Sequence, residues 1–264
     1  MEKVINKPLS ETFSWLRMGG AKLDLPEAEE KVINVAEGES ETLVLEKSSA
    51  FLEIKACLEK DSSLDLIQIS EDGDCAVTDI KVNCGDGAAF HWYRLVLGGK
   101  KTYDNCSVSL EGKKSSFTAD IGYSLKDDEI FDVNCEALHV GKQTESAIKA
   151  SGVLDGNAKK LMRGTIDFRN GSSGSVGNET EDVLLLSDSV VNKSVPVILC
   201  SEEDVEGNHG ATIGMPDERI IYYMNSRGIS EDEALMMLSR AKLTSVINKI
   251  PDDKIREALE ERIE

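Results

Sequence analysis

The chain has 264 residues, of which 40% are hydrophobic, with 5 prolines and 21 glycines. This composition suffices for one sizeable core, or a core with a small appended module, and excludes a peptide or a disordered chain. Thirty basic and 49 acidic side chains give a net charge of −19, which would repel nucleic-acid phosphates and anionic lipid surfaces. Neither nucleic acid nor a membrane is therefore expected as a partner.

The expected location follows from two absences in the sequence. An apolar stretch such as Val195–Cys200 falls far short of the ~20 residues that a membrane-spanning helix needs. The first residues show no apolar signal core followed by a small-residue cleavage site. We therefore expect a cytoplasmic protein.

The six cysteines are predicted to be scattered thiols. They stand at positions 57, 75, 84, 106, 135 and 200, without one Cys-x-x-Cys pair. The spacing encodes neither a zinc knuckle nor a thioredoxin-type motif. Cys84 and Cys135 end stretches of alternating polarity, where a thiol behaves as a small buried hydrophobic residue.

We divide the chain into a short N-terminal segment (1–30), a core (31–214) and a C-terminal helical domain (215–264). Within the first segment, residues 9–16 form a possible short amphipathic helix, closed by Gly19 and Gly20.

The core is predicted to be all β. Polar and apolar residues alternate with a period of two, as in the stretches 31–35, 42–45, 64–69, 79–84, 107–110, 117–121 and 165–168. Short polar, glycine-containing turns separate them, and no helical stretch is long enough for a βαβ crossover. A sandwich, a barrel and a solenoid all accept this pattern, and pattern alone leaves the sandwich and a solenoid of stacked strands equally open.

The last fifty residues change to helical patterns. A first helix is expected over 217–228, with Ile220, Tyr223 and Met224 on one face and Gly228 at its C-terminal end. The second begins at the capping box 230–233 and runs to Pro251, with a stripe made of Ala234, Leu238, Ala241 and Ser245. A third, capped by Asp252 or Asp253, places Ile255, Leu259 and Ile263 four residues apart.

Motifs of enzymatic chemistry are missing from the sequence. It contains no phosphate-binding loop, no dinucleotide fingerprint and no Gly-x-Ser-x-Gly elbow. His91, His139 and His209 are isolated, and 49 carboxylates make any chance pair uninformative. We expect a protein that is not an enzyme. His209, in a predicted loop between Gly207 and Gly210, is the candidate ligand for a metal or partner, and a plain loop histidine remains the simpler alternative.

The stretch from Asn208-His-Gly-Ala-Thr-Ile-Gly to Ser-Arg-Gly-Ile-Ser-Glu-Asp-Glu-Ala234 resembles the signature of the SufB/SufD family of iron–sulfur cluster assembly proteins. Further matches are Gly152-Val-Leu-Asp-Gly156, Leu184-Leu-Leu-Ser-Asp188 and Pro196, so the resemblance covers roughly residues 90–264. The N-terminal part is shorter than in typical members.

The resemblance implies a right-handed parallel β-helix followed by a small C-terminal helical domain. It also implies docking of an ABC-type ATPase through that domain, pairing with a SufB-like subunit or a second copy, and a transient iron or iron–sulfur cluster shared with the partner rather than tightly bound. The candidate partner-binding residues are Asp217, Ile220, Tyr223, Arg227, Gly228 and Glu233.

Departures from the signature favour the SufD branch. In the SufB branch a glutamate follows the loop histidine and a cysteine precedes the Leu-Leu strand. Here Gly210 follows His209, and Glu181 stands at about the position of that cysteine. The resemblance makes His209 a candidate iron ligand, whereas Glu181, a possible oxygen ligand, is more simply read as an ordinary exposed glutamate.

Three hypotheses follow. The first is a non-enzymatic scaffold subunit of a Suf-type assembly complex. The second is a β-solenoid that partners an ATPase without handling iron. The third, a polysaccharide-acting β-helix enzyme, is disfavoured because no export signal is seen.

Overall fold

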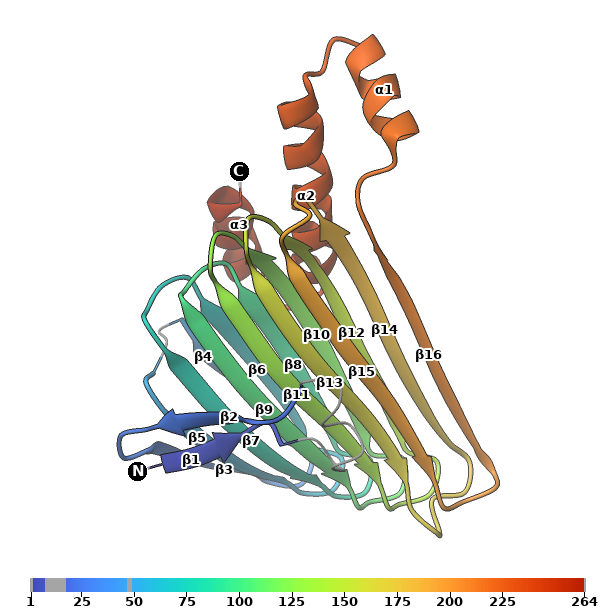
Figure 1. Cartoon of the computed structure of the whole chain (residues 1–264). Helices are drawn as coiled ribbons and strands as arrows, with labels where there is room; N and C mark the ends of the chain where they lie inside the picture. The colour runs from blue at the N-terminus through green and yellow to red at the C-terminus, as the bar shows by residue number, and fades with distance from the viewer. Residues whose placement is uncertain (1, 8–17, 47–48, 264) are drawn as a thin grey trace.

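The computed structural model of the chain describes residues 2–7, 18–46 and 49–263. Its core is a parallel β-solenoid in which the chain alternates between two seven-stranded sheets (Figure 1). One sheet contains β3 (Glu29–Val35), β5 (Leu52–Leu58), β7 (Ala76–Cys84), β9 (Lys101–Leu110), β11 (Ile130–His139), β13 (Lys159–Phe168) and β15 (Val191–Cys200). The other contains β4 (Ser40–Leu45), β6 (Ser63–Ser70), β8 (Ala89–Val96), β10 (Ser116–Leu125), β12 (Glu145–Leu154), β14 (Ser175–Leu185) and β16 (Val205–Gly214).

Each strand pairs in parallel with the strand two positions away in the chain, which decides between the two folds left open by the pattern. The length of a coil is not constant: Glu29 pairs with Leu52, 23 residues on, whereas Lys159 pairs with Val191, 32 residues on. A coil that lengthens along the chain leaves no fixed sequence period, so the solenoid carries no visible repeat.

The core fills the space between the two sheets with alternate side chains from every coil. Its largest fully buried members include Trp92, Phe90, Phe117, Tyr123 and Phe131. The rings of Phe90 and Phe117, in adjacent coils, stack with centroids 5.5 Å apart. The expected burial of Cys84 and Cys135 is confirmed, and Cys106 is buried with them, whereas Cys57 and Cys200 are exposed. Stacked apolar columns of this kind are what hold the coils in register.

Glycines let successive coils approach closely at one corner of the solenoid. A Cβ atom added to Gly112 would lie 2.0 Å from the backbone of Gly85, and one added to Gly141 would lie 2.3 Å from the carbonyl oxygen of Gly112. Any larger residue there would push two coils apart.

An N-terminal hairpin, β1 (Glu2–Ile5) and β2 (Ala21–Asp24), pairs antiparallel and packs on the sheet that begins with β3. The Nδ2 group of Asn6 donates to the Oδ1 atom of Asp132 (2.8 Å), and the guanidinium of Arg163 donates to both Asp132 and the carbonyl oxygen of Met18. The helix predicted over residues 9–16 lies outside the described residues.

Three helices close the chain: α1 (Glu218–Ser226), α2 (Glu231–Ile247) and α3 (Asp253–Arg262). All three predictions of a helix are confirmed, and so are the capping box at Ser230 and the cap at Asp252. In the part of the chain that the structure describes, none of them is long and apolar enough to cross a membrane.

The second half of α2 lies on the outer face of the second sheet. It covers an apolar cluster containing Ile67, Ile69, Tyr93 and Leu95 with its own residues Leu243, Val246 and Ile247, and with Ile250 and Leu259 behind it. The predicted stripe is wrong at Ala241 and Ser245, which are exposed. The helix touches the sheet only along part of its length, so the sheet, not the helical period, selects which residues are buried.

Candidate functional site

The last coil of the solenoid, made of β15 and β16, is open. β15 pairs only with β13, and β16 only with β14, so each strand has one edge without a neighbour in the described chain. Far fewer residues are buried in this last coil: alternate residues of β14 are buried, whereas nearly every residue of β16 is exposed. We call the inward-facing surface of these two strands the open end.

His209 lies in the middle of β16, not in a loop, and this corrects the sequence prediction. His209 pairs in register with Glu179 of the neighbouring strand β14. Flanking glycines suggested a loop, but the neighbouring strand supplies hydrogen-bond partners for the backbone, and tertiary pairing overrides the low β-propensity of glycine. Gly207 is also useful there, because an added Cβ would lie 3.0 Å from the side chain of Ile198. The imidazole of His209 is exposed at the open end.

Glu181 is buried, contrary to its reading as an ordinary exposed glutamate. It lies in β14, is 6% exposed, and forms an ion pair with the ammonium group of Lys160, which is itself fully buried. Lys160 also donates to the hydroxyl oxygen of Ser194 at 2.9 Å. Burial lowers the pKa of Lys160, and the Glu181 carboxylate opposes that shift. A carboxylate held by an ammonium group in this way is already partnered.

Glu179 is a third ionisable residue of this buried cluster, and no motif or resemblance pointed to it. It is 5% exposed, and its Oε2 atom has no hydrogen-bond partner in the structure. Its carboxylate lies against Gly164, whose missing side chain makes the room. Burial raises the pKa of Glu179 to about 7, and the charge of Glu181 adds to the effect. The side chains of the odd-numbered residues of β14 point inward. In the sequence, this alternation was the only signal that could have identified Glu179 as an inward-facing residue.

The open end therefore presents one exposed imidazole in front of a buried Lys160–Glu179–Glu181 cluster. Among the described residues no group of three His, Cys, Asp or Glu side chains is placed to hold a metal ion. His209 alone offers a single nitrogen ligand, and a stable site needs further donors. An iron ion bound at His209 would take those donors from another molecule.

The second candidate surface is formed by α1 and the first half of α2. α1 stands away from the two sheets (Figure 1), and none of its nine residues is buried. Large apolar side chains are exposed across this surface: Met215, Ile220, Tyr222, Tyr223, Met236 and Met237. Several large exposed apolar side chains on neighbouring elements are typical of an interaction site.

The six candidate partner-binding residues fall into two groups. Asp217 caps α1, Gly228 takes a positive φ of 87° after its last turn, and Glu233 completes the capping box of α2. These three residues fix the ends of the helices. By contrast, Ile220 and Tyr223 are exposed one turn apart, and the guanidinium of Arg227 lies 5.2 Å from the centre of the Tyr223 ring. The side chains of this second group take no part in a helix cap.

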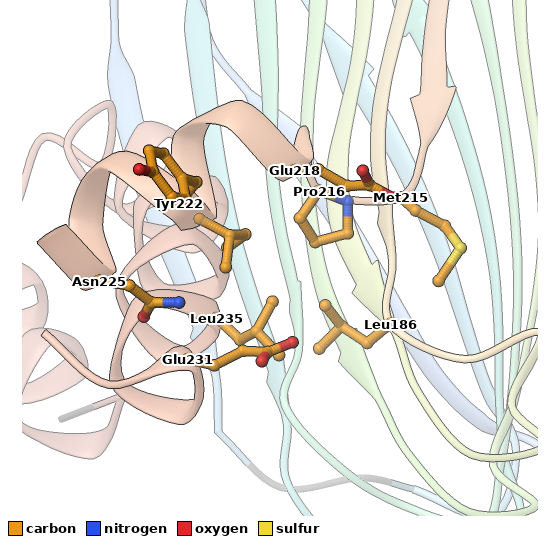
Figure 2. Close-up of a pocket in the computed structure, with 9 residues that line it drawn as sticks. Leu186, Met215, Pro216, Glu218, Tyr222, Asn225, Glu231 and Leu235 are labelled. Atoms are coloured by element: carbon orange, nitrogen blue, oxygen red, sulfur yellow. The ribbon is translucent and has the colours of Figure 1, made fainter.

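A cavity of about 400 Å³ lies between α1, the start of α2 and the loop that follows β14. Figure 2 shows Tyr222 and Pro216 on one side of it and Leu186 and Leu235 on the other, with the carboxylates of Glu218 and Glu231 nearby.

The fold places this chain among the parallel β-solenoid proteins that carry C-terminal helices. Sequence comparison then identifies the family. Residues 24–242 match the family model described as SUF system FeS cluster assembly, SufBD core domain. The chain belongs to the SufBD family of iron–sulfur cluster assembly proteins.

Named relatives agree with this assignment. The chain is 30% identical over 129 residues to the iron–sulfur cluster assembly protein SufD of Bacillus subtilis, a region that makes up 49% of this chain and 30% of that protein. It is 27% identical over 165 residues to a SufBD family protein of Mycobacterium tuberculosis (62% and 20%). It is 26% identical over 182 residues to a chloroplastic SufBD family protein of Arabidopsis thaliana (67% and 32%). The matched regions span about a fifth to a third of these relatives. The match to SufD is in line with the SufD branch.

Proposed function

We propose that this chain is a non-enzymatic scaffold subunit of a Suf-type iron–sulfur cluster assembly complex, and that it docks an ABC-type ATPase through α1 and the start of α2. One observation carries the proposal. α1 is an amphipathic helix whose apolar face, including Ile220 and Tyr223, is left exposed, with none of its residues buried against the chain's own core. Burial against a partner would remove this apolar area from water and so stabilise the helix.

Tyr223 and Arg227 are suited to the centre of such an interface. Tyrosine and arginine are enriched among the residues whose truncation costs most binding energy, and here the guanidinium already lies over the ring. The acidic surface of the chain favours a partner with basic residues around its apolar contact.

The docking proposal is tested by substituting residues of α1 in the full chain. Removing residues 216–264 is less informative, because it would also uncover the buried apolar residues Tyr93 and Leu95. The double substitution Ile220→Asp and Tyr223→Ala alters only exposed side chains, and we expect it to abolish co-purification with the ATPase. Glu257→Ala, on α3, is the matched control and should bind normally. An Ile220/Tyr223 variant that still co-purifies contradicts the docking assignment.

A second copy of the chain, or a SufB-like subunit, is proposed to meet the open end. The free edges of β15 and β16 present unpaired backbone groups, which favour the addition of another β-surface. Such a partner would also bring donors close to His209, whose single imidazole cannot hold iron alone. Iron or a nascent cluster would therefore be a transient, shared cargo.

The metal role of His209 has its own test. His209→Ala changes an exposed side chain, so the fold should persist while iron retention and acid-labile sulfide fall in the anaerobically purified complex. Asn208→Ala, on the neighbouring exposed position, is the control. Unchanged iron and sulfide in the His209 variant would remove the metal role without touching the docking proposal.

The alternative function is a β-solenoid interaction protein that partners an ATPase without handling iron. Its support is that Glu181 is already paired with Lys160 and that the described residues assemble no three-ligand site. Anaerobic co-expression with the ATPase encoded nearest to it discriminates the two. A stable complex without iron, even when a SufB-like subunit is present, favours the alternative. The cytoplasmic location stays a prediction from the sequence.

A further inference from the structure

The cavity beneath α1 is lined mainly by apolar side chains and also by two carboxylates. Leu186, Leu235, Pro216 and Tyr222 provide apolar walls on opposite sides (Figure 2), and Met215 and Ile221 extend them. The carboxylates of Glu218 and Glu231 belong to the same lining. At about 400 Å³ the cavity falls within the range of functional binding pockets.

The chain leaves these walls exposed to solvent. Tyr222 is 77% exposed and Met215 57% exposed, although both line the cavity. The helix that forms its roof is fixed by its ends: Asp217 caps it and binds Arg219, and the backbone N–H of Ile229 donates to the carbonyl oxygen of Met224 after Gly228. α1 is thus held over an apolar hollow that its own side chains do not fill.

The charge of the segment that forms the cavity indicates which kind of ligand would bind there. The segment 215–235 contains five acidic residues and two arginines, and Arg219 is already paired with Asp217. The acidic residues are Asp217, Glu218, Glu231, Asp232 and Glu233. Two of these residues, Glu218 and Glu231, line the cavity. A ligand that enters here therefore meets apolar walls within an acidic segment, which an apolar side chain flanked by lysine or arginine complements.

We propose that this cavity is a receptor for an apolar anchor side chain of the ATPase partner, presented by a segment with basic residues on either side. The inference rests on the proposed docking function and adds to it a specific contact. In this arrangement the exposed face of α1, with Ile220 and Tyr223, contacts the partner's surface, while the anchor enters beneath the helix. A buried anchor surrounded by a rim that excludes water is the usual origin of strong binding.

The test blocks the cavity without touching that exposed face. Asn225 lines the cavity from α1, is exposed, and takes no part in a cap through its side chain, so Asn225→Trp should fill the cavity. We expect the affinity of the full chain for the purified ATPase to fall at least about tenfold, through faster dissociation. Lys254→Trp, on α3, is the matched control and should bind as the unchanged chain does.

Two further variants keep the test decisive if the tryptophan disturbs the helix. Tyr222→Ala removes a largely exposed wall of the cavity, and it should also weaken binding. Glu231→Lys reverses one charge of the cavity lining. Its effect should be several-fold at low salt and shrink as salt is raised, because exposed charges are screened.

The outcomes separate this inference from the function on which it rests. If the unchanged chain does not bind the ATPase, the docking function fails. If the unchanged chain binds, the Ile220/Tyr223 variant does not, and the Asn225, Tyr222 and Glu231 variants bind normally, then the receptor role is overturned while docking stands. Light scattering on the chain alone adds one more outcome: if Asn225→Trp dissociates an oligomer, the cavity holds a second copy and the inference is likewise wrong.

Discussion

The buried ion pair between Lys160 and Glu181 makes the sharpest prediction about stability. Both side chains are at most 6% exposed, and Glu179 lies beside them with one unpartnered oxygen. Lys160→Met keeps the volume but leaves two carboxyl groups without their cation. Removing one partner of a buried pair costs about 3–5 kcal/mol, because a charge remains uncompensated or must be protonated at a cost. We expect a loss of this size at pH 7.5.

The pair variant isolates the cause. With Lys160→Met and Glu181→Leu together, only the carboxyl group of Glu179 remains, and because burial raises its pKa to about 7 it can be protonated at little cost. Stability should then return to within about 1 kcal/mol of the unchanged chain or exceed it. Lys100→Met, which breaks the exposed pair with Asp74, is the matched control and should leave the unfolding free energy unchanged within error.

The assay combines urea unfolding with native-state hydrogen exchange of the amides of β13 and β14. Exchange is needed because a solenoid can open coil by coil from its free end, so that a global midpoint averages over several steps. The reasoning is refuted if Lys160→Met destabilises the chain no more than Lys100→Met does, or if the pair variant is as unstable as the single one.

Two other predictions concern the core and the corner of the solenoid. Burial lowers the pKa of His139 to about 4, and its ring nitrogens lie 2.7 Å and 2.8 Å from the hydroxyl oxygens of Thr144 and Ser146. Because the unfolded chain binds this proton more readily, stability should be lost as pH falls from about 6.5 to 4, by up to about 3 kcal/mol from this group. His139→Gln should flatten that part of the profile, and an unchanged slope would contradict the prediction. Gly112→Ala should destabilise the chain by at least about 1–3 kcal/mol, because the added Cβ would collide with backbone atoms of the preceding coil. Gly210→Ala, which has open space around it, is the control and should leave stability unchanged. Equal melting temperatures of the two variants would refute the idea that glycine is needed for the close approach of coils at this corner.

The two candidate surfaces are joined by a short stretch of chain. β16, which carries His209, leads through Gly214 and Pro216 directly into α1. α2 and the turn that follows it are anchored to the second sheet, because Lys242 pairs with Asp182 of β14 and Lys249 pairs with Asp120 of β10.

The sequence by itself determined the β core, the helical end and the family. Alternation along 64–69 or 79–84 survives in any fold that buries one face of a strand. The capping box at Ser230 and the cap of α3 act within one turn of helix, so local residues suffice to predict them. The stretch around His209 carried the resemblance because it is a nearly continuous run of matching residues.

Only the tertiary structure decided how the strands pair and which side chains share a site. Parallel pairing of each strand with the next but one is a property of residues 23 to 32 positions apart, and no local pattern encodes it. The same pairing turned a glycine-flanked stretch into β16 and placed His209 above Glu179. It also buried Glu181 against Lys160, two charged residues that a local reading assigns to solvent, because ion pairing across two strands offsets the cost of taking both from water.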